Sequence, residues 1–134
     1  MADYEFEHSV ETSADERAVW ELWSTIDRWV EWDTSVQKVT LDGPFEVGVE
    51  GTMHIEGMPP LDFRLTEVEP GVGFVDETAI PGGVVRFGHR LERVGDRVRV
   101  THRVEIDGPG ELGPAITEDV PEAMEALVRL AEKG

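Results

Sequence analysis

Two histidines, His89 and His102, occupy matching positions in the stretch VVRFGHRLERVGDRVRVTHRVEI (residues 84–106). Apolar and polar residues alternate on both sides of Gly95-Asp96, a dipeptide typical of a two-residue β-hairpin turn. With that turn, His89 lies directly opposite His102, and on the other face arginines lie opposite glutamates. The pattern predicts a hairpin with one charged face and one apolar face, and the apolar face carries an imidazole pair.

A carboxylate, Asp76, is predicted on the preceding strand. If Gly82-Gly83 is a two-residue turn, Asp76 faces His89, whereas a three-residue turn would direct Glu77 inward instead. The first register is preferred because it also directs the apolar residues of this strand inward. An imidazole beside a carboxylate can act as a general base, so the candidate catalytic residues are His89, His102 and Asp76.

Three interpretations of the histidines remain open. The preferred one is that they are neutral polar groups lining a water-containing cavity, hydrogen-bonded to each other or to Tyr4. The second is recognition of a polar group on a ligand in an otherwise apolar pocket. The third is catalysis or metal binding, for which His8 has the same inward phase. Flat neighbouring strands hold imidazoles too far apart to converge on one ion, so neither a metal nor a cofactor is expected.

The elements that position these residues follow one another without a linker or repeat. A strand is predicted at residues 4–11, two short helices up to about residue 32, and six further strands joined mostly by tight turns. The apolar stripe over residues 112–132 predicts a long C-terminal helix. Pro121 either kinks this helix, which is preferred, or starts a second helix after Asp119. One domain, residues 1–134, is expected.

Composition restricts the classes of partner. The chain has 29 acidic and 12 basic residues, a formal charge of −17 and no cysteine. This balance argues against nucleic acid and against stable association with anionic membranes, and it excludes disulfides and thiolate metal sites. No apolar run is long enough to span a bilayer, and the N-terminus does not resemble a leader, so a cytoplasmic protein is expected. The arginines of the hairpin are interpreted as an ion-paired strand face.

Four segments resemble the START/Bet v 1-like (SRPBCC) superfamily, in particular its polyketide cyclase/dehydrase and lipid transport group. They are ADERAVWELWSTIDRWVEWDTSVQKVTLDG (residues 14–43), VGVEGTM (47–53), LTEVEPGVGF (65–74) and DVPEAMEALVRLAE (119–132). The resemblance implies an α+β helix-grip fold, in which a curved seven-stranded antiparallel sheet wraps around a long C-terminal helix, with two short helices between strands 1 and 2. It also implies a hydrophobic cavity between sheet and helix.

The resemblance implies binding of a small apolar or aromatic, lipid- or polyketide-like molecule, by a monomer or homodimer. One alternative is a polyketide aromatase/cyclase or dehydratase that uses the pocket histidines, and another is a co-chaperone-like interaction module that uses the outer face. The fold alone does not specify an activity, and binding is the preferred hypothesis. The candidate ligand-binding residues are Trp32, Met53, Phe63, Phe74, Phe87, His89, His102, Met124 and Leu127. Trp32 is expected to border the pocket mouth.

Overall fold

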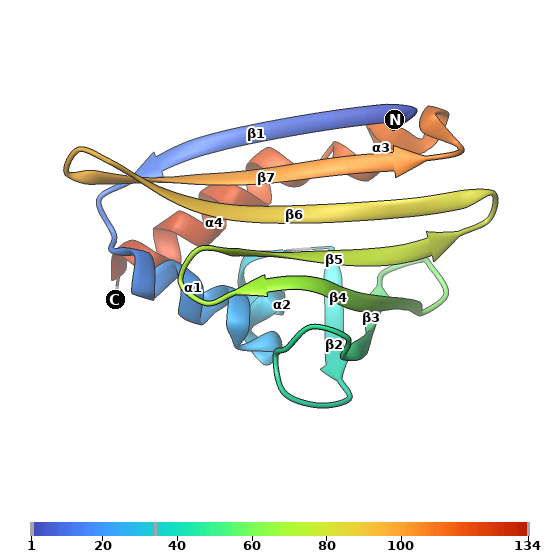
Figure 1. Cartoon of the computed structure of the whole chain (residues 1–134), viewed down its shortest axis with the longest axis horizontal. Coiled ribbons are helices and arrows are strands. Elements are labelled where there is room, and N and C mark those ends of the chain that lie inside the picture. The colour runs from blue at the N-terminus through green and yellow to red at the C-terminus, as the bar shows by residue number, and fades with distance from the viewer. Residues whose placement is uncertain (1, 34, 134) are drawn as a thin grey trace.

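The computed structural model describes residues 2–33 and 35–133 (Figure 1). The strands are β1 (Tyr4–Thr12), β2 (Val36–Leu41), β3 (Glu50–Ile55), β4 (Leu61–Glu69), β5 (Gly73–Ile80), β6 (Gly83–Val94) and β7 (Arg97–Asp107). The α-helices are α1 (Glu16–Ser24), α2 (Trp29–Trp32), α3 (Gly113–Thr117) and α4 (Val120–Lys133), and two 3₁₀ turns are η1 (Ile26–Arg28) and η2 (Gly110–Leu112). None of the helices in these described ranges is long and apolar enough to cross a membrane.

The strands form one seven-stranded antiparallel sheet in the order β1-β7-β6-β5-β4-β3-β2. The first strand therefore pairs with the last one, and the tight turns join neighbours, as short connections require. All helices lie on one side of the sheet, and α4 runs across its concave face (Figure 1). The predicted helix-grip fold is confirmed.

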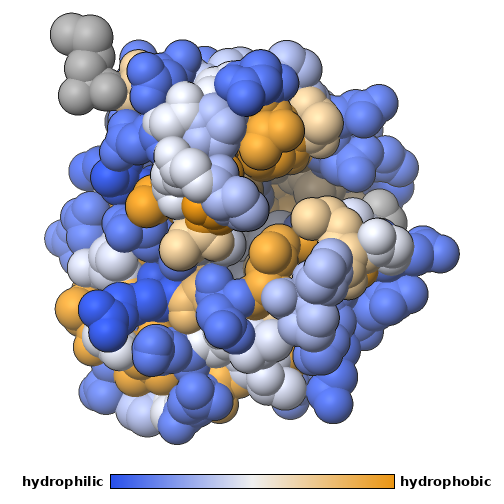
Figure 2. Space-filling view, turned by 90° about the vertical axis from the view of Figure 1, so that its right-hand side faces the viewer, coloured by the Kyte–Doolittle hydropathy of each residue, from blue (hydrophilic) through white to orange (hydrophobic). Residues whose placement is uncertain are grey.

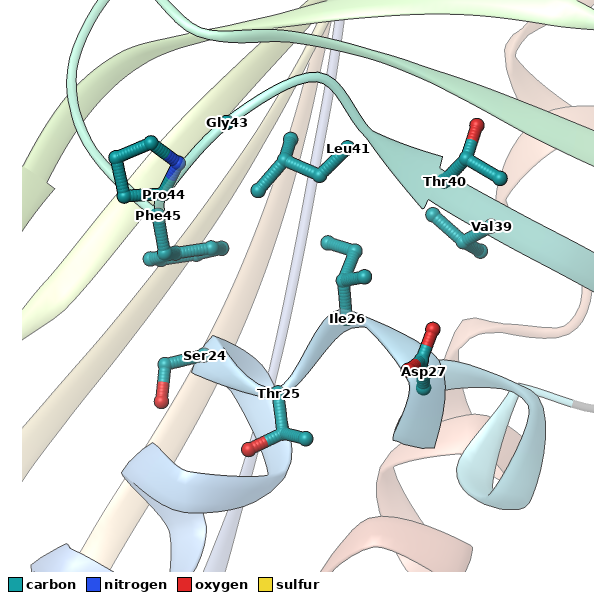
Figure 3. Close-up of a pocket in the computed structure, with 10 residues that line it drawn as sticks. All are labelled: Ser24, Thr25, Ile26, Asp27, Val39, Thr40, Leu41, Gly43, Pro44 and Phe45. Carbon is teal, nitrogen blue, oxygen red and sulfur yellow. The ribbon is translucent and has the colours of Figure 1, made fainter.

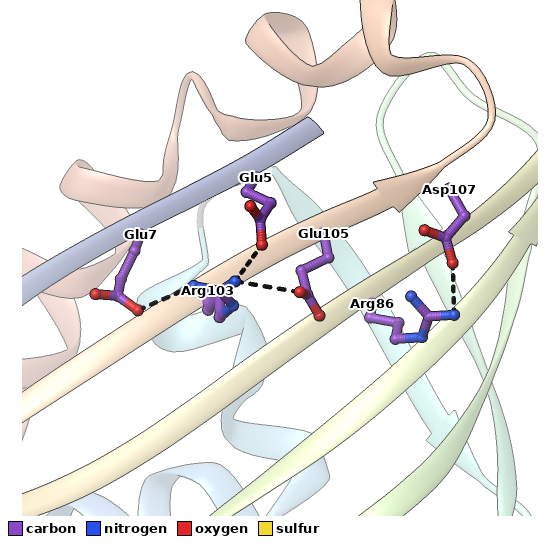
Figure 4. Close-up of polar contacts among 6 residues, drawn as sticks. All are labelled: Glu5, Glu7, Arg86, Arg103, Glu105 and Asp107. Atoms are coloured by element: carbon purple, nitrogen blue, oxygen red, sulfur yellow. Dashed lines mark hydrogen bonds and ion pairs between the residues drawn. The ribbon is translucent and has the colours of Figure 1, made fainter. Parts of the chain in front are cut away.

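The β6–β7 hairpin has the predicted register. Gly95 takes a φ of 64° in the turn, and His89 pairs with His102. On the outer face, Arg99 binds Glu92 at 2.9 Å. Figure 4 shows two further outward arginines: Arg103 contacts Glu5, Glu7 and Glu105, and Arg86 binds Asp107. The outer face is thus an ion-paired strand surface, as the alternation of charges indicated.

The predicted β5–β6 register is wrong by two residues. The turn is Pro81-Gly82, Ile80 pairs with Gly83, and Asp76 therefore lies opposite Phe87 instead of His89. Gly82 takes the positive φ of 86°, as the second central residue of a type II turn does. Gly83 is the first residue of β6, and the position requires glycine because a Cβ there would lie 1.8 Å from the carbonyl oxygen of Asp107. The predicted phase is correct, since Phe74, Asp76 and Ile80 all face inward.

The C-terminal segment is two helices, and the preferred single kinked helix is wrong. α3 ends at Thr117 and α4 begins at Val120. Pro121 lies in the first turn of α4, where its missing N–H has no helical partner to lose. The Ala123 N–H donates to the Asp119 carbonyl at 2.9 Å, so the new helix begins directly after the break.

The buried apolar side chains form two clusters. The larger one lies under α1, α2 and α4 and includes the fully buried Trp23, Phe74 and Leu127. The smaller one consists of Val85, Val104 and Ile106, towards the end of the sheet where β7 leads into α3. Polar groups, among them Asp76, Thr78 and His102, are buried on the same concave side.

Candidate functional site

The two central histidines are in contact inside the concave face. Their ring centroids are 4.7 Å apart with an interplanar angle of 73°. The ring of His89 also stacks on Phe74, its partner across β5–β6, with centroids 3.9 Å apart and an angle of 6°. His8 on β1 pairs with His102 from the other side. The strand ladders therefore place three histidines side by side across β1, β7 and β6.

Trp23 on α1 covers this pair. Its ring centroid lies 5.5 Å from that of His89 and 5.8 Å from that of His102. The Nδ1 of His89 lies 3.3 Å from the Phe74 carbonyl oxygen. Trp23 Nε1 and His102 Nε2 are both buried and have no hydrogen-bond partner among the described residues. Tyr4, which was expected near the histidines, pairs its hydroxyl with that of Thr117 at 3.0 Å instead.

Burial keeps both imidazoles neutral. It lowers the pKa of His89 to about 3, against a smaller opposing effect of the Phe74 carbonyl. It lowers the pKa of His102 well below the usual value, and the neighbouring His89 and His8 lower it further. A base with a pKa of about 3 is a weak proton acceptor at neutral pH. The pair is suited to hydrogen bonding more than to proton abstraction.

Asp76 is a second polar feature, separate from the histidines. Its side chain is 3% exposed, and it forms no hydrogen bond or ion pair with any described residue. Its cross-strand neighbours are Leu65 and Phe87, and Phe74 and Thr78 flank it along β5. Burial raises the pKa of Asp76 to about 8. The carboxyl group is therefore mostly protonated at pH 7.

Aromatic side chains from the short helices fill the space above one half of the sheet. Trp29 stacks on Phe63 and Phe74, with centroids 5.7 Å and 6.0 Å apart. Trp32 is 4% exposed and donates from Nε1 to the Leu22 carbonyl at 3.3 Å. Trp32 thus lies in the core, whereas the sequence placed it at an open pocket mouth.

The other half of the concave face is less completely filled. Phe87, Ile80 and Met53 have inward phase in their strands but are only half-buried. Met124 and Leu127 of α4 are fully buried against the sheet. Figure 2 looks onto the end of the molecule where the β5–β6 turn and the β3–β4 loop lie, and it shows a hollow with apolar side chains on its rim.

A separate cleft of about 560 Å³ opens between the helices and β2 (Figure 3). Its walls come from the α1–η1 segment and from β2 with the loop that follows it. The ring of Phe45 closes its inner side and packs edge-on against Phe74, 5.0 Å away between centroids. None of the predicted ligand-binding residues lines this cleft, and Phe74 and His89 line a hollow of only about 80 Å³.

The sequence pattern does not identify three aromatic residues that belong to the site: Trp23, Trp29 and Phe45. Trp23 belongs to an apolar stripe with Val19 and Leu22, which predicts burial of the helix face but not its partner. Phe45 follows a turn and has no periodic context. Only the tertiary structure shows that both side chains contact the histidine–Phe74 group.

Comparisons with known proteins agree with this architecture. The family model described as "Polyketide cyclase / dehydrase and lipid transport" matches residues 3–132. No curated protein matches the sequence.

Three solved structures have similar folds. Ara h 8.0201 has a TM-score of 0.76 at 9% identity, over 98% of this chain and 99% of that one. A protein from Arthrobacter aurescens has a TM-score of 0.73 at 18% identity, over 97% and 87%. Norcoclaurine synthase from Thalictrum flavum, in complex with dopamine and hydroxybenzaldehyde, has a TM-score of 0.73 at 13% identity, over 96% and 86%.

Proposed function

The chain belongs to the polyketide cyclase/dehydrase and lipid transport family, and we propose that it binds a small hydrophobic or aromatic molecule between the concave face of the sheet and α4. The entrance is the hollow of Figure 2. The proposal concerns this end of the concave face, because aromatic rings already fill the other end.

One observation carries the proposal: inward-facing apolar side chains of β3, β5 and β6 remain half-buried. Protein interiors are ordinarily packed to crystal density, so such positions are normally closed. Phe87, Ile80 and Met53 instead retain exposed apolar surface on the concave side of the sheet, which also holds the buried polar groups Asp76 and Thr78. An apolar lining with a few convergent polar groups is the usual composition of a ligand pocket.

The predicted ligand-binding residues take two roles in this proposal. Met53 and Phe87 contact the ligand directly. The remaining ones form the walls and the closed inner end of the cavity: Trp32, Phe63, Phe74, His89, His102, Met124 and Leu127. A similar fold accommodates two small aromatic molecules in norcoclaurine synthase. That precedent supports an aromatic ligand here.

Cavity filling tests the proposal. The neutral fluorescent probe N-phenyl-1-naphthylamine is titrated into wild-type protein, Ile80→Trp and a matched control, Val47→Trp, at a side chain that is 61% exposed. The larger side chain at position 80 should weaken probe binding by about tenfold or more, because it occupies the space of the ligand. Val47→Trp should bind like the wild type. Identical titrations for all three proteins, or no binding to the wild type, would refute the proposal.

A second candidate function, that of a polyketide aromatase/cyclase or dehydratase, is favoured by Asp76 alone. An acid with a pKa of about 8 can exchange a proton near neutral pH. Because Asp76 lies opposite Phe87, the histidines are not its partners in this function. Turnover of a poly-β-ketone analogue should then be abolished by Asp76→Asn and should survive in a His89→Phe/His102→Phe double variant. Turnover that persists in Asp76→Asn would refute catalysis by this residue.

A further inference from the structure

We infer that the ligand of this cavity carries a positively charged amine, which Asp76 binds as a carboxylate. The inference rests on the proposed function, since it specifies the chemical class of the molecule that enters the same cavity. The ligand therefore consists of an apolar body with one cationic end.

The first argument is the isolation of Asp76. Buried polar groups are almost always hydrogen-bonded, and a buried carboxylate without a partner is costly. Asp76 has no partner among the described residues: its neighbours Leu65, Phe87 and Phe74 have no polar side-chain atom, and no hydrogen bond joins it to Thr78. The partner of this carboxyl group therefore comes from outside the described residues, as water or as a bound ligand.

The second argument is the distribution of charge. No arginine or lysine in the described part of the chain is buried. His89 and His102, which lie on the same concave side as Asp76, are unprotonated because they are buried. A ligand carboxylate would therefore meet no cation in the cavity. A ligand cation would meet one carboxyl group and no competitor.

The third argument comes from the N-terminal end of α4, which in Figure 1 points towards the side of the molecule that faces the viewer in Figure 2. Asp33 follows α2, and the pKa of its carboxyl is raised by burial and, to a smaller extent, by the charge of Asp119 directly before α4. These two carboxylates therefore lie near each other between α2 and α4. Together with the net charge of −17, they favour the approach of cations.

A neutral carbonyl compound is the competing class, because a protonated Asp76 can donate a hydrogen bond to it. The amine gains more binding free energy from Asp76 than the carbonyl compound does. Ionising Asp76 at pH 7 from a pKa of about 8 costs only about tenfold in affinity, and a hydrogen bond between two charged groups is about twice as strong as a neutral one. The low dielectric of the cavity strengthens that contact further.

The inference predicts release of a proton on binding. The free protein holds a protonated Asp76 at pH 7, the complex holds a carboxylate paired with the ammonium group, and the proton passes to the buffer. The groups that face Asp76 are Leu65 from β4, Phe87 and diagonally His89 from β6, while α4 directs Met124 and Leu127 inward. Only His89 among them can titrate, and its pKa of about 3 keeps it neutral throughout.

Three matched probes test the inference: 4-phenylbutylamine, 4-phenylbutan-1-ol and 4-phenylbutanoate. Calorimetry at pH 7 in two buffers of different ionisation enthalpy gives affinity and proton release for each. The amine should bind about tenfold more tightly than the alcohol and release close to one proton, and the carboxylate should bind most weakly. The amine affinity should rise about tenfold per pH unit from pH 6 and level off above pH 8.

Two variants test whether Asp76 causes the preference for the amine and the release of a proton. Asp76→Asn should lose the amine preference and the proton release while it still binds the alcohol, and Asp62→Asn, at an exposed carboxylate of β4, should behave like the wild type. If the alcohol or the carboxylate displaces N-phenyl-1-naphthylamine as well as the amine does, the inference is wrong and the proposed cavity stands. If neither the three probes nor N-phenyl-1-naphthylamine binds, the proposed function itself is wrong.

Discussion

Asp76 lies opposite Phe87 in the β5–β6 ladder, while His89 lies opposite Phe74 one inward position further along. The carboxyl and the imidazole are therefore diagonal neighbours with an aromatic ring beside each of them. Burial alone shifts the pKa of Asp76, and no effect of Asp76 contributes to that of His89. The concave face carries two independent polar features, which separate variants can test.

Asp76 should make the protein less stable as the pH rises. Its pKa is about 8 in the folded chain and 3.8 in the unfolded chain, so the folded state holds the extra proton between these values. The free energy of unfolding should fall by up to about 1.4 kcal/mol per unit from about pH 4 to pH 8 through this group alone. Asp76→Asn removes the effect.

Urea unfolding of the wild type and Asp76→Asn at pH 5, 7 and 9 measures this. The advantage of the variant should grow from pH 5 to pH 7 and change little beyond pH 8. A constant difference between the two proteins across this range would mean that Asp76 ionises normally in the folded state.

The histidine pair should make the protein less stable as the pH falls, opposite to the effect of Asp76. His102 stays neutral in the folded protein, whereas an unfolded histidine gains a proton as the pH falls below about 6.5. Protonation thus favours the unfolded chain in acid. His102→Phe removes this penalty and the unpartnered Nε2. Its stability relative to the wild type should increase by up to about 1.4 kcal/mol per unit as the pH falls from 6.5 to 4.5.

Thermal and urea unfolding at several pH values compare the two proteins, and NMR of the ring protons reports protonation directly. His89 and His102 should show no titration between pH 5 and pH 8. A titration midpoint near 6.5 for either ring would contradict the neutral, buried pair.

The sequence contains the information for the fold in its alternations and turns. The β6–β7 register follows from Gly95-Asp96 together with matched apolar pairs, since a slip of one residue would expose the whole apolar set. The β5–β6 register does not follow in the same way, because three consecutive turn formers, Pro81, Gly82 and Gly83, permit several loops. In the structure Gly83 is the first residue of β6 and approaches the Asp107 carbonyl of β7, a contact between strands that the turn residues alone do not specify.

The sequence also predicts only part of the candidate site, because the packing of helices on the sheet is not a local property. Inward phase identifies His89, Asp76 and Phe87 as concave residues, because phase is a local property of each strand. Which rings cover them depends on how the short helices dock. Trp23 against the histidines and Trp29 against Phe74 are contacts between helix and sheet, for which the periodicity has no signal.

Removing the indole of Trp23 should both destabilise the protein and expose the histidines. Trp23→Ala leaves a cavity beside His89, His102 and Phe74, so the free energy of unfolding should fall by about 3–5 kcal/mol. Water entering the cavity should raise the pKa of both imidazoles towards the ordinary value. Trp20→Ala, at a half-buried ring of the same helix, is the matched control.

Urea unfolding measures the loss of stability, and NMR titration measures the two histidines. In Trp20→Ala, His89 and His102 should remain neutral down to pH 5. Histidines that stay neutral in a folded Trp23→Ala protein would show that the strands, and not the indole, exclude water from them.

The contact between Tyr4 and α3 should hold that helix at the edge of the concave face. A Cβ added to Gly113 would lie 2.4 Å from the Tyr4 ring, and the Tyr4 hydroxyl pairs with Thr117 at 3.0 Å. Tyr4→Phe removes only the hydrogen bond and should cost about 1 kcal/mol. Gly113→Ala forces the ring or the helix to move and should cost more, by an amount typical of overpacking, about 1–3 kcal/mol.

Hydrogen exchange of the α3 amides should accelerate in Gly113→Ala more than in Tyr4→Phe, while the amides of β6 and β7 keep their protection. Equal exchange of α3 in both variants and the wild type would show that this close approach does not hold the helix.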